Sequence, residues 1–268
     1  MDLQLLLPKV IDLAKAAGNF IRTEQINFSK ERLEFKGAND LVSYVDREAE
    51  KILVAGLSEM IPEAGFITEE ETVEQKAAEY QWVIDPLDGT TNFVHGIPFY
   101  SVSVALLFKG QSVLGVVYEI NQDECFYAIQ DGKAYCNENE IKVSDAGSLS
   151  ESVITSGYPH RNYDHLPFYM DTIASLMRQT QGMRRLGSAA ADLAYVACGR
   201  VSCFFEANLN SYDVAAGALI VQQAGGRVTD FQGGNNWLFG REIIAANGIH
   251  LDVLEVIRRN WDQLNHLQ

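Results

Sequence analysis

Residues 81–93 read QWVIDPLDGTTNF, where an apolar run at 82–84 stops at Asp85 and Asp88 follows three residues later. Asp, Pro and Gly are typical of surface turns, so a plain turn explains this stretch. Two carboxylates at a strand end, followed by free backbone N–H groups, also suit a divalent metal and a phosphate. From the spacing alone both interpretations stay open.

In the metal interpretation, Asp85, Asp88 and the carbonyl of Leu87 converge on one cation. Gly89 and Thr90 then offer backbone N–H groups at the start of a helix, where a phosphate is favoured. The hydroxyl of Thr90 lies beside the predicted metal and can orient a water molecule.

The charge of the chain limits the classes of partner. A formal net charge of −15 over 268 residues argues against nucleic-acid binding, because that binding depends on clustered Lys and Arg. An anionic substrate would therefore need a positive group that the acidic chain lacks, and a bound divalent cation would supply it.

The cysteines and the N-terminus predict a cytoplasmic protein. Four cysteines without a C-x-x-C pair are too few for a disulfide framework in a chain of this length, and they suit a reducing compartment. The first residues carry Asp2 and continue into an amphipathic pattern, unlike a signal peptide. No apolar run is long enough for a membrane span, so no membrane partner is expected.

Hydrophobic periodicity predicts a mixed α/β protein. Helices are expected in the first 21 residues and at about 46–60, short strands at 66–68 and 82–84, and a β-meander from 100 to 143 with an Asp-Gly turn at 131–132. After about residue 145, strands and helices alternate. We therefore expect one domain, 1–268, built from two intimately packed halves, about 1–145 and 146–268.

Several carboxylates stand at the predicted ends of elements. A helix cap explains Asp46 or Asp213 taken singly, and a solvated acidic turn explains Glu69 to Glu71 as well as metal binding does. The full set is Asp46, Glu69, Glu70, Asp85, Asp88, Glu206 and Asp213.

Three motifs stand out: Glu69-Glu70 after FIT, the string WVIDPLDGTTNF, and YDVAAGALIVQQAGG at 212–226. Together they resemble the inositol monophosphatase family of Mg²⁺-dependent, Li⁺-sensitive phosphomonoesterases. NDLVSYVD at 39–46 and RRLGSAAADLAYVACGR at 184–200 resemble its intervening segments, so the resemblance covers nearly the whole chain. It implies an αβαβα sandwich, a homodimer, two or three Mg²⁺ ions per site and a small phosphorylated polyol, above all inositol monophosphate, as substrate.

The resemblance also implies a role for each matching residue. The implied metal ligands are Glu69, Asp85, the Leu87 carbonyl, Asp88 and Asp213, with Glu70 as an outer or additional metal partner. Thr90, assisted by Asp46, is implied to activate the attacking water, with Glu69 also in the catalytic set. The implied substrate contacts are Asp88, Asp213, the amides of Gly89 and Thr90, Glu206 for hydroxyl groups, and Ser188-Ala189 as a wall for the polyol. Lys36 would lie in a loop over the site.

The sequence leaves the substrate open. Tyr212 stands where the family commonly has Trp. The alternative substrates are a 3′-phosphorylated nucleotide bisphosphate, fructose 1,6-bisphosphate and histidinol phosphate. Arg184 and Arg185 could contact a second phosphate or a partner subunit, or could form an ordinary solvated or salt-bridged pair. A non-catalytic regulator that binds metal or phosphate is the alternative of another class, although the predicted ligands and water-activating groups are all present.

Overall fold

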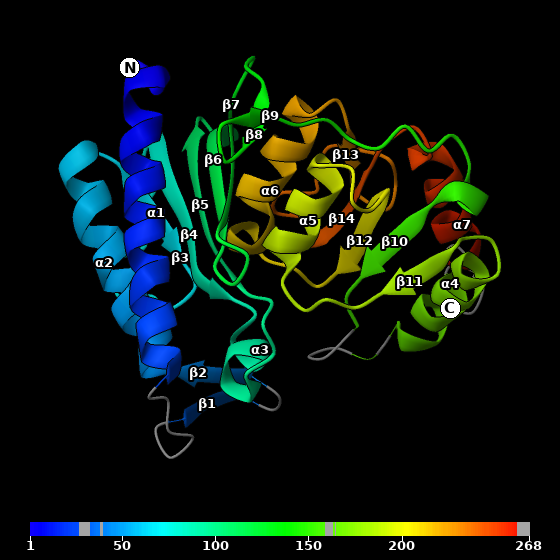
Figure 1. The fold of residues 1–268 in the computed structure, drawn as a ribbon, viewed down its shortest axis with the longest axis horizontal. Coiled ribbons are helices and arrows are strands. Elements are labelled where there is room, and N and C mark those ends of the chain that lie inside the picture. The colour runs from blue at the N-terminus through cyan, green and yellow to red at the C-terminus, as the bar shows by residue number, and fades with distance from the viewer. Residues whose placement is uncertain (27–32, 38–39, 159–162, 164, 262–268) are drawn as a thin grey trace.

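The structure is a computed structural model of the chain and describes residues 1–26, 33–37, 40–158, 163 and 165–261. Layers alternate in the order helix, sheet, helix, sheet, helix (Figure 1). The predicted mixed α/β fold with an αβαβα arrangement is therefore confirmed.

The first layer holds α1 (Leu3–Ile26) and α2 (Tyr44–Met60), which lie side by side on one face of the larger sheet (Figure 1). The predicted apolar face of α1 is buried at Leu6, Val10, Ala17 and Ile21. Burial of this face against the sheet fixes the orientation of both helices.

The larger sheet has seven strands in the order β3-β4-β5-β6-β7-β8-β9. Only the β3–β4 pair is parallel. The strands from β5 onward form the antiparallel meander expected from the sequence, and β4 pairs antiparallel with β5. The strands are β3 (Gly65–Thr68), β4 (Tyr80–Asp88), β5 (Ser101–Phe108), β6 (Gln111–Glu119), β7 (Glu124–Ile129), β8 (Ala134–Cys136) and β9 (Asn139–Glu140).

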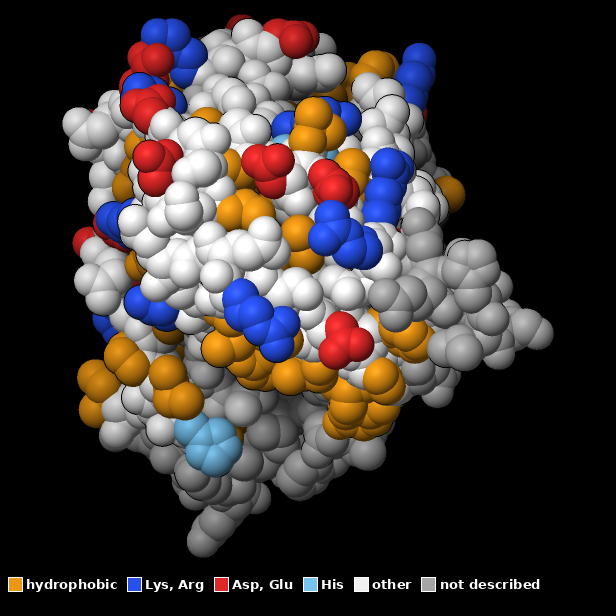
Figure 2. Space-filling view, turned by 90° about the vertical axis from the view of Figure 1, so that its right-hand side faces the viewer, with side chains coloured by type: hydrophobic (Ala, Val, Ile, Leu, Met, Phe, Trp, Pro, Cys, Tyr) orange, Lys and Arg blue, Asp and Glu red, His pale blue; other side chains and the backbone are white. Residues whose placement is uncertain are grey.

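The smaller sheet has five strands in the order β11-β10-β12-β14-β13. Its strands are β10 (Val153–Ser156), β11 (Gly182–Arg184), β12 (Cys203–Ala207), β13 (Arg227–Thr229) and β14 (Glu242–Ala246). Helices α4 (Leu166–Met177) and α7 (His250–Trp261) cover its outer face. Figure 2 faces the end of the molecule that these helices form, and there acidic and basic side chains are interspersed among apolar ones.

The middle layer consists of α5 (Ala189–Ala197) and α6 (Ser211–Gln223), which pack between the two sheets. Both helices are rich in alanine and almost wholly buried. Gly115 of β6 permits this close approach, because a Cβ there would lie 2.8 Å from the carbonyl oxygen of Ala216 in α6. The small residues therefore bring the first turns of α5 and α6 to the edge of the larger sheet.

Some elements differ from the prediction. Strand β4 does not stop at Asp85 but continues to Asp88. The hairpin of β1 (Leu33–Gly37) and β2 (Asp40–Ser43) was not anticipated, and Lys36, expected in a loop, belongs to β1. The short α3 (Thr90–His95) and a 3-10 turn at Leu149–Glu151 complete the described elements.

Two further expectations concern the environment of the chain. All four cysteines are unbonded, with Cys125 and Cys203 buried and the other two half-buried. Among the described residues, no helix combines the length and the apolar character that crossing a membrane requires.

Candidate active site

The end of β4 contains a β-bulge. Asp85 pairs with Ser103 and Asp88 with Ser101 of β5, so three steps along β4 match two along its partner. Residues three apart in a regular strand point to opposite faces of a sheet. The extra residue reverses this alternation and turns both carboxylates to the same side, which explains how the D-P-L-D spacing can form one site.

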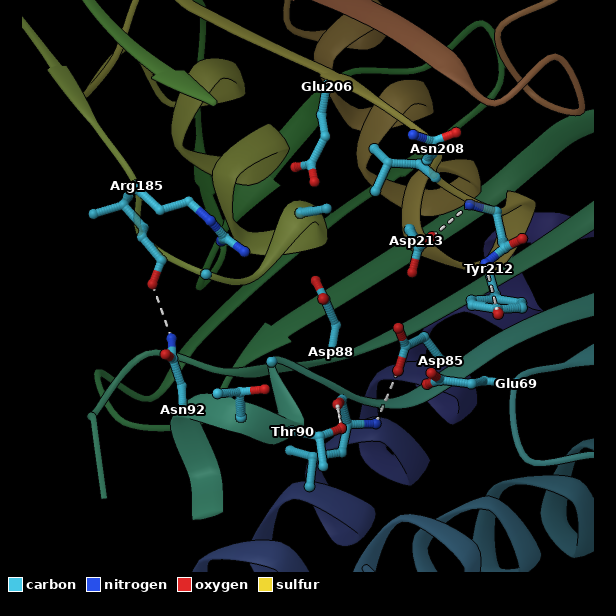
Figure 3. Close-up of a pocket in the computed structure, with 18 residues that line it drawn as sticks. Glu69, Asp85, Asp88, Thr90, Asn92, Arg185, Glu206, Asn208, Tyr212 and Asp213 are labelled. Carbon is cyan, nitrogen blue, oxygen red and sulfur yellow. Dashed lines mark hydrogen bonds between the residues drawn. The ribbon is translucent and has the colours of Figure 1, made fainter. Parts of the chain in front are cut away.

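Asp85, Asp88 and Asp213 form a carboxylate cluster (Figure 3). One oxygen from each lies within 4.8 Å of the others, and Asp213 comes from the first turn of α6 in the other half of the chain. Asp85 is 2% exposed, and its Oδ1 accepts a hydrogen bond of 3.0 Å from the backbone N–H of Leu87. Asp85 and Asp88 lie close together in the sequence, whereas Asp213 joins them only through the packing of α6.

Asp85 and Asp88 are buried close to other negative charges, and the pKa values of both are raised. Burial first, and then the charges of Glu69, Asp88 and Asp213, raise the pKa of Asp85 well above its usual range. Burial also raises the pKa of Asp88, although hydrogen bonds from Ser188 and Ala190 oppose that shift. A divalent cation would oppose these upward shifts, because it stabilises the ionised form of every carboxylate around it. The all-oxygen donor set fits a hard cation such as Mg²⁺ or Ca²⁺.

Thr90 begins α3 and is held from α2. Its Oγ1 lies 2.8 Å from Oδ1 of Asp46, which is completely buried, and 3.1 Å from the carbonyl oxygen of Leu87. A hydroxyl has one proton, and a carboxylate is the stronger acceptor. Thr90 therefore donates to Asp46 and keeps its own lone pairs for a donor such as water.

The turn after β3 brings Glu69 into the cleft. Its N–H donates to the carbonyl oxygen of Ile84 over 3.3 Å, and its side chain lines the cleft beside Asp85 (Figure 3). Glu70 does not line the cleft. Its side chain is 2% exposed, with Oε2 4.0 Å from Nε of Arg47.

Asp88 is anchored to the first turn of α5. Its Oδ2 accepts hydrogen bonds from Oγ of Ser188 at 2.7 Å and from the N–H of Ala190 at 2.6 Å. Ser188 is 1% exposed and is also the N-cap of α5, so it lies behind Asp88 and does not line the cleft, whereas Ala189 does. The predicted Ser188-Ala189 wall is thus divided between an anchor and a lining residue.

Glu206 belongs to β12 and lines the side of the cleft opposite Thr90 (Figure 3). It is 5% exposed, and burial raises its pKa to about 8, against the opposing effect of Arg185. Gly157 makes room for it, because a Cβ there would lie 1.9 Å from the Glu206 carboxyl group.

The segment between Glu206 and Asp213 contributes residues that sequence reasoning missed. The N–H of Asn210 donates to Oδ2 of Asp213 at 2.5 Å, and Nδ2 of Asn210 donates to the hydroxyl of Tyr212 at 2.7 Å. An indole N–H could not accept that bond, so Tyr212 is matched to Asn210. Asn208 also lines the cleft, and neither Asn carries a sequence signal stronger than its place between two predicted acids.

The two consecutive arginines have different positions. Arg185 is the only basic residue among the described residues that line the cleft, whereas Arg184 is exposed and donates to the carbonyl oxygen of Met183. Asn92 holds the loop of Arg185 in place, since its Nδ2 donates to the carbonyl oxygens of Leu186 at 2.8 Å and Phe99 at 2.7 Å. The Asn of the T-T-N string, Asn92, therefore stabilises the loop that carries Arg185.

The cleft has a volume of about 470 Å³ and opens between the ends of the two sheets. Gly89 lines it with a φ of 100°, and a Cβ there would lie 3.1 Å from the carbonyl oxygen of Gly187. Both the left-handed conformation and the close approach explain why a glycine follows Asp88.

The sequence profile of the inositol monophosphatase family matches residues 2–263. The chain is a member of the inositol monophosphatase family. An inositol-1-monophosphatase of Mesorhizobium japonicum is 40% identical over 91% of this chain and 92% of its own length. A protein of Escherichia coli K12 named Nus factor SuhB is 39% identical over 87% of this chain and 88% of its own length.

Solved structures agree with this inositol monophosphatase family assignment. The extragenic suppressor protein suhB of Bartonella henselae superposes with a TM-score of 0.89 at 38% identity, covering 95% of this chain and 99% of that one. The IMPase of Thermotoga maritima gives a TM-score of 0.86 at 34% identity, covering 94% and 96%. This family member is therefore a phosphatase, and the buried acidic cluster is where it could bind a metal.

Proposed function

We propose that this phosphatase hydrolyses a small polyol monophosphate, most readily inositol monophosphate, with Mg²⁺ and a water nucleophile. The observation that carries the proposal is the cluster of Asp85, Asp88 and Asp213 beside the hydrogen-bonded pair of Thr90 and Asp46. Oxygen ligands and a group that can orient water are together what metal-assisted phosphate ester hydrolysis needs.

The proposed ligands of two or three Mg²⁺ ions are Glu69, Asp85, the Leu87 carbonyl, Asp88 and Asp213, with Glu70 as an outer or additional partner. Bound Mg²⁺ would supply charge stabilisation for the phosphoryl oxygens and the leaving alkoxide, and would acidify a bound water. The raised pKa of Asp85 supports this assignment, since burial and the neighbouring acids disfavour its ionised form and a bound cation would stabilise that form.

Thr90 is the proposed acceptor of a hydrogen bond from the attacking water. Because the Thr90 hydroxyl donates its hydrogen bond to Asp46, the lone pairs of Oγ1 point away from Asp46 and can accept a hydrogen bond from water. Glu69, on the same side of the cleft, is the proposed second group that orients this water.

The substrate would lie between the amides of Gly89 and Thr90, which bind the phosphate, and Glu206, which binds a hydroxyl group of the polyol. A carboxyl group with a pKa of about 8 can donate to a hydroxyl when protonated and accept from it when ionised. Ala189 is the proposed apolar contact of the ring, and Asp88 and Asp213 complete the binding surface. For Ser188 the hydrogen bond to Asp88 favours an anchoring role over direct contact with the polyol.

The decisive test measures phosphate release from inositol 1-phosphate, glycerol 2-phosphate, fructose 1,6-bisphosphate, adenosine 3′,5′-bisphosphate and histidinol phosphate. Each reaction is run with Mg²⁺, with EDTA, and with Mg²⁺ plus Li⁺. We expect Mg²⁺-dependent, Li⁺-suppressed release that is fastest from inositol 1-phosphate. A faster bisphosphate would reassign the substrate, and release that persists in EDTA would overturn the metal mechanism.

Arg185 decides between the monophosphate and bisphosphate alternatives. As the basic side chain lining the cleft, it is the candidate partner of a second phosphate. For a monophosphate enzyme, Arg185→Gln should reduce kcat/KM for all esters alike. A loss confined to the bisphosphates would support the alternative substrates, and Arg184→Gln, outside the cleft, is the matched control.

Relatives that carry the name Nus factor favour a second candidate, a role in an assembly with another protein. The net charge of −15 and the interspersed charges of Figure 2 support a protein partner over a nucleic acid. An Asp88→Asn variant that loses phosphatase activity yet complements deletion of the gene would favour this role.

We also propose a homodimer of single-domain subunits in the cytoplasm. Because α5 and α6 pack on both sheets, the halves 1–145 and 146–268 should unfold together. Light scattering should give about twice the mass of one chain, and urea should produce one unfolding transition by both fluorescence and circular dichroism.

A further inference from the structure

Glu50 is a completely buried carboxylate on α2 that lies one helical turn after Asp46. It does not line the cleft, so it takes no direct part in the proposed chemistry. A buried charge is costly unless hydrogen bonds replace its hydration, and the groups that replace it show what Glu50 holds.

Among the described residues, the four hydrogen-bond donors to Glu50 all belong to the acidic turn, residues 68–72. Its Oε1 accepts from Oγ1 of Thr68 at 3.0 Å and from both the N–H and the Oγ1 of Thr72 at 2.7 Å. Its Oε2 accepts from the N–H of Glu70 at 2.8 Å. Both oxygens are therefore used, and the bonds bracket the turn on either side of Glu70.

Two features of the acidic turn disfavour its conformation. Three consecutive glutamates repel one another, and Glu71 adopts a φ of 52° in the left-handed region that residues with a side chain disfavour. The Glu69 N–H donates to Ile84 over 3.3 Å, and the side chain of Gln75 bonds to both the N–H and the Oγ1 of Thr68 at 3.0 Å. Beyond Thr68, Glu50 is the acceptor on α2 that binds the backbone N–H groups of Glu70 and Thr72.

We propose that Glu50 is a positioning residue that holds Glu69 and Glu70 in the arrangement needed for metal binding. Without it, metal binding would have to order the acidic turn, and the loss of conformational freedom would weaken affinity. Helix α2 then positions two parts of the site, Thr90 through Asp46 and the acidic turn through Glu50. The inference rests on the proposed metal-dependent function.

Glu50→Gln tests the anchor with little change of shape. An amide offers one acceptor, so its oxygen can keep the three bonds from the threonines while its NH₂ faces the N–H of Glu70. Thr72→Val removes one bond to Glu50 without changing charge. Glu48→Gln is the matched control, since Glu48 is on the same helix but is exposed and paired with Lys51.

The readouts are Mn²⁺ affinity by calorimetry, amide hydrogen exchange of residues 68–72 in metal-free protein, and activity as a function of Mg²⁺ concentration. For Glu50→Gln we expect Mn²⁺ affinity about 10- to 100-fold weaker, faster exchange at Glu70 and Thr72, and activity restored towards wild type by excess Mg²⁺. Thr72→Val should weaken Mn²⁺ affinity and speed up exchange in the same way but to a smaller extent. Glu48→Gln should have the affinity and exchange of wild type.

Wild-type affinity and exchange in both Glu50→Gln and Thr72→Val would overturn the proposal, as would weakened affinity in Glu48→Gln equal to that in Glu50→Gln. Should Glu50→Gln fail to fold, Thr72→Val decides. A wild-type protein that binds no Mn²⁺ would refute the proposed function, and the exchange measurement would then still show separately whether Glu50 holds the turn.

Discussion

Two segments of the cleft, 85–90 and 206–213, each connect a strand to a helix and present acids, yet they are held differently. In the first, Asp88 is anchored by α5 and Thr90 by Asp46 of α2, whereas Asp85 accepts a local hydrogen bond from the N–H of Leu87. In the second, Asp213 is bound within its own turn by the N–H of Asn210. The side chains of Asp88 and Thr90 therefore depend on distant elements, whereas the side chain of Asp213 is bound locally and the backbone of its segment is held by Ser103 and Arg241.

The largest effect is expected from Asp88→Asn. The amide oxygen can still accept hydrogen bonds from Ser188 and Ala190. The NH₂ group then points towards the other carboxylates, where it cannot act as a metal ligand and repels a cation. Phosphate release should fall to background while circular dichroism stays unchanged. Near-normal turnover would refute the ligand role.

Thr90→Ala should lower kcat by about 10²-fold or more, with less effect on metal affinity, because it removes a group acting on the nucleophile. Steady-state kinetics and Mn²⁺ calorimetry measure the two effects. Thr91→Ala removes the neighbouring hydroxyl as a control. An effect on KM alone would contradict the role of Thr90.

Glu206 should make the stability of the metal-free protein pH-dependent. Its pKa is raised to about 8 in the folded state from an ordinary 4.5, so the folded state binds the proton more tightly. Its stabilising contribution is complete below pH 4.5 and is lost as pH rises to about 8, by at most about 1.4 kcal/mol per pH unit.

Urea unfolding of wild type and Glu206→Gln at several pH values measures this effect. The stability of wild type relative to the variant should decline between pH 4.5 and 8 and then level off. A constant difference would show that Glu206 titrates normally in the fold.

The smallest effect is expected from Tyr212→Phe, which removes the bond from Asn210 inside the second segment. Loss of one such bond should lower the free energy of unfolding by about 1 kcal/mol, with little change in kcat. Thermal unfolding and kinetics check this. A large loss of activity would mean that catalysis depends on the hydrogen bonds of residues 206–213 as strongly as on those of residues 85–90.

The periodicity of α1, the meander and the alternating second half was readable because each pattern reflects one buried face. The hairpin β1–β2 was not, since short strands without strong alternation carry little signal. The continuation of β4 through Pro86 was also missed, because the bulge depends on pairing with β5, a long-range contact. Glu50 escaped notice for a similar reason: its four donors lie 18 to 22 residues away.

The sequence by itself determined the class of fold, and its motif strings carried the family resemblance, because periodic burial and dense acid-rich strings are local properties. The fold decided which acids share one place. Asp213 reaches Asp85 only when α6 packs between the sheets, and Ser188 becomes an anchor only when α5 begins beside Asp88. Distances between residues 100 or more positions apart depend on the packing of whole layers, and no local pattern contains that information.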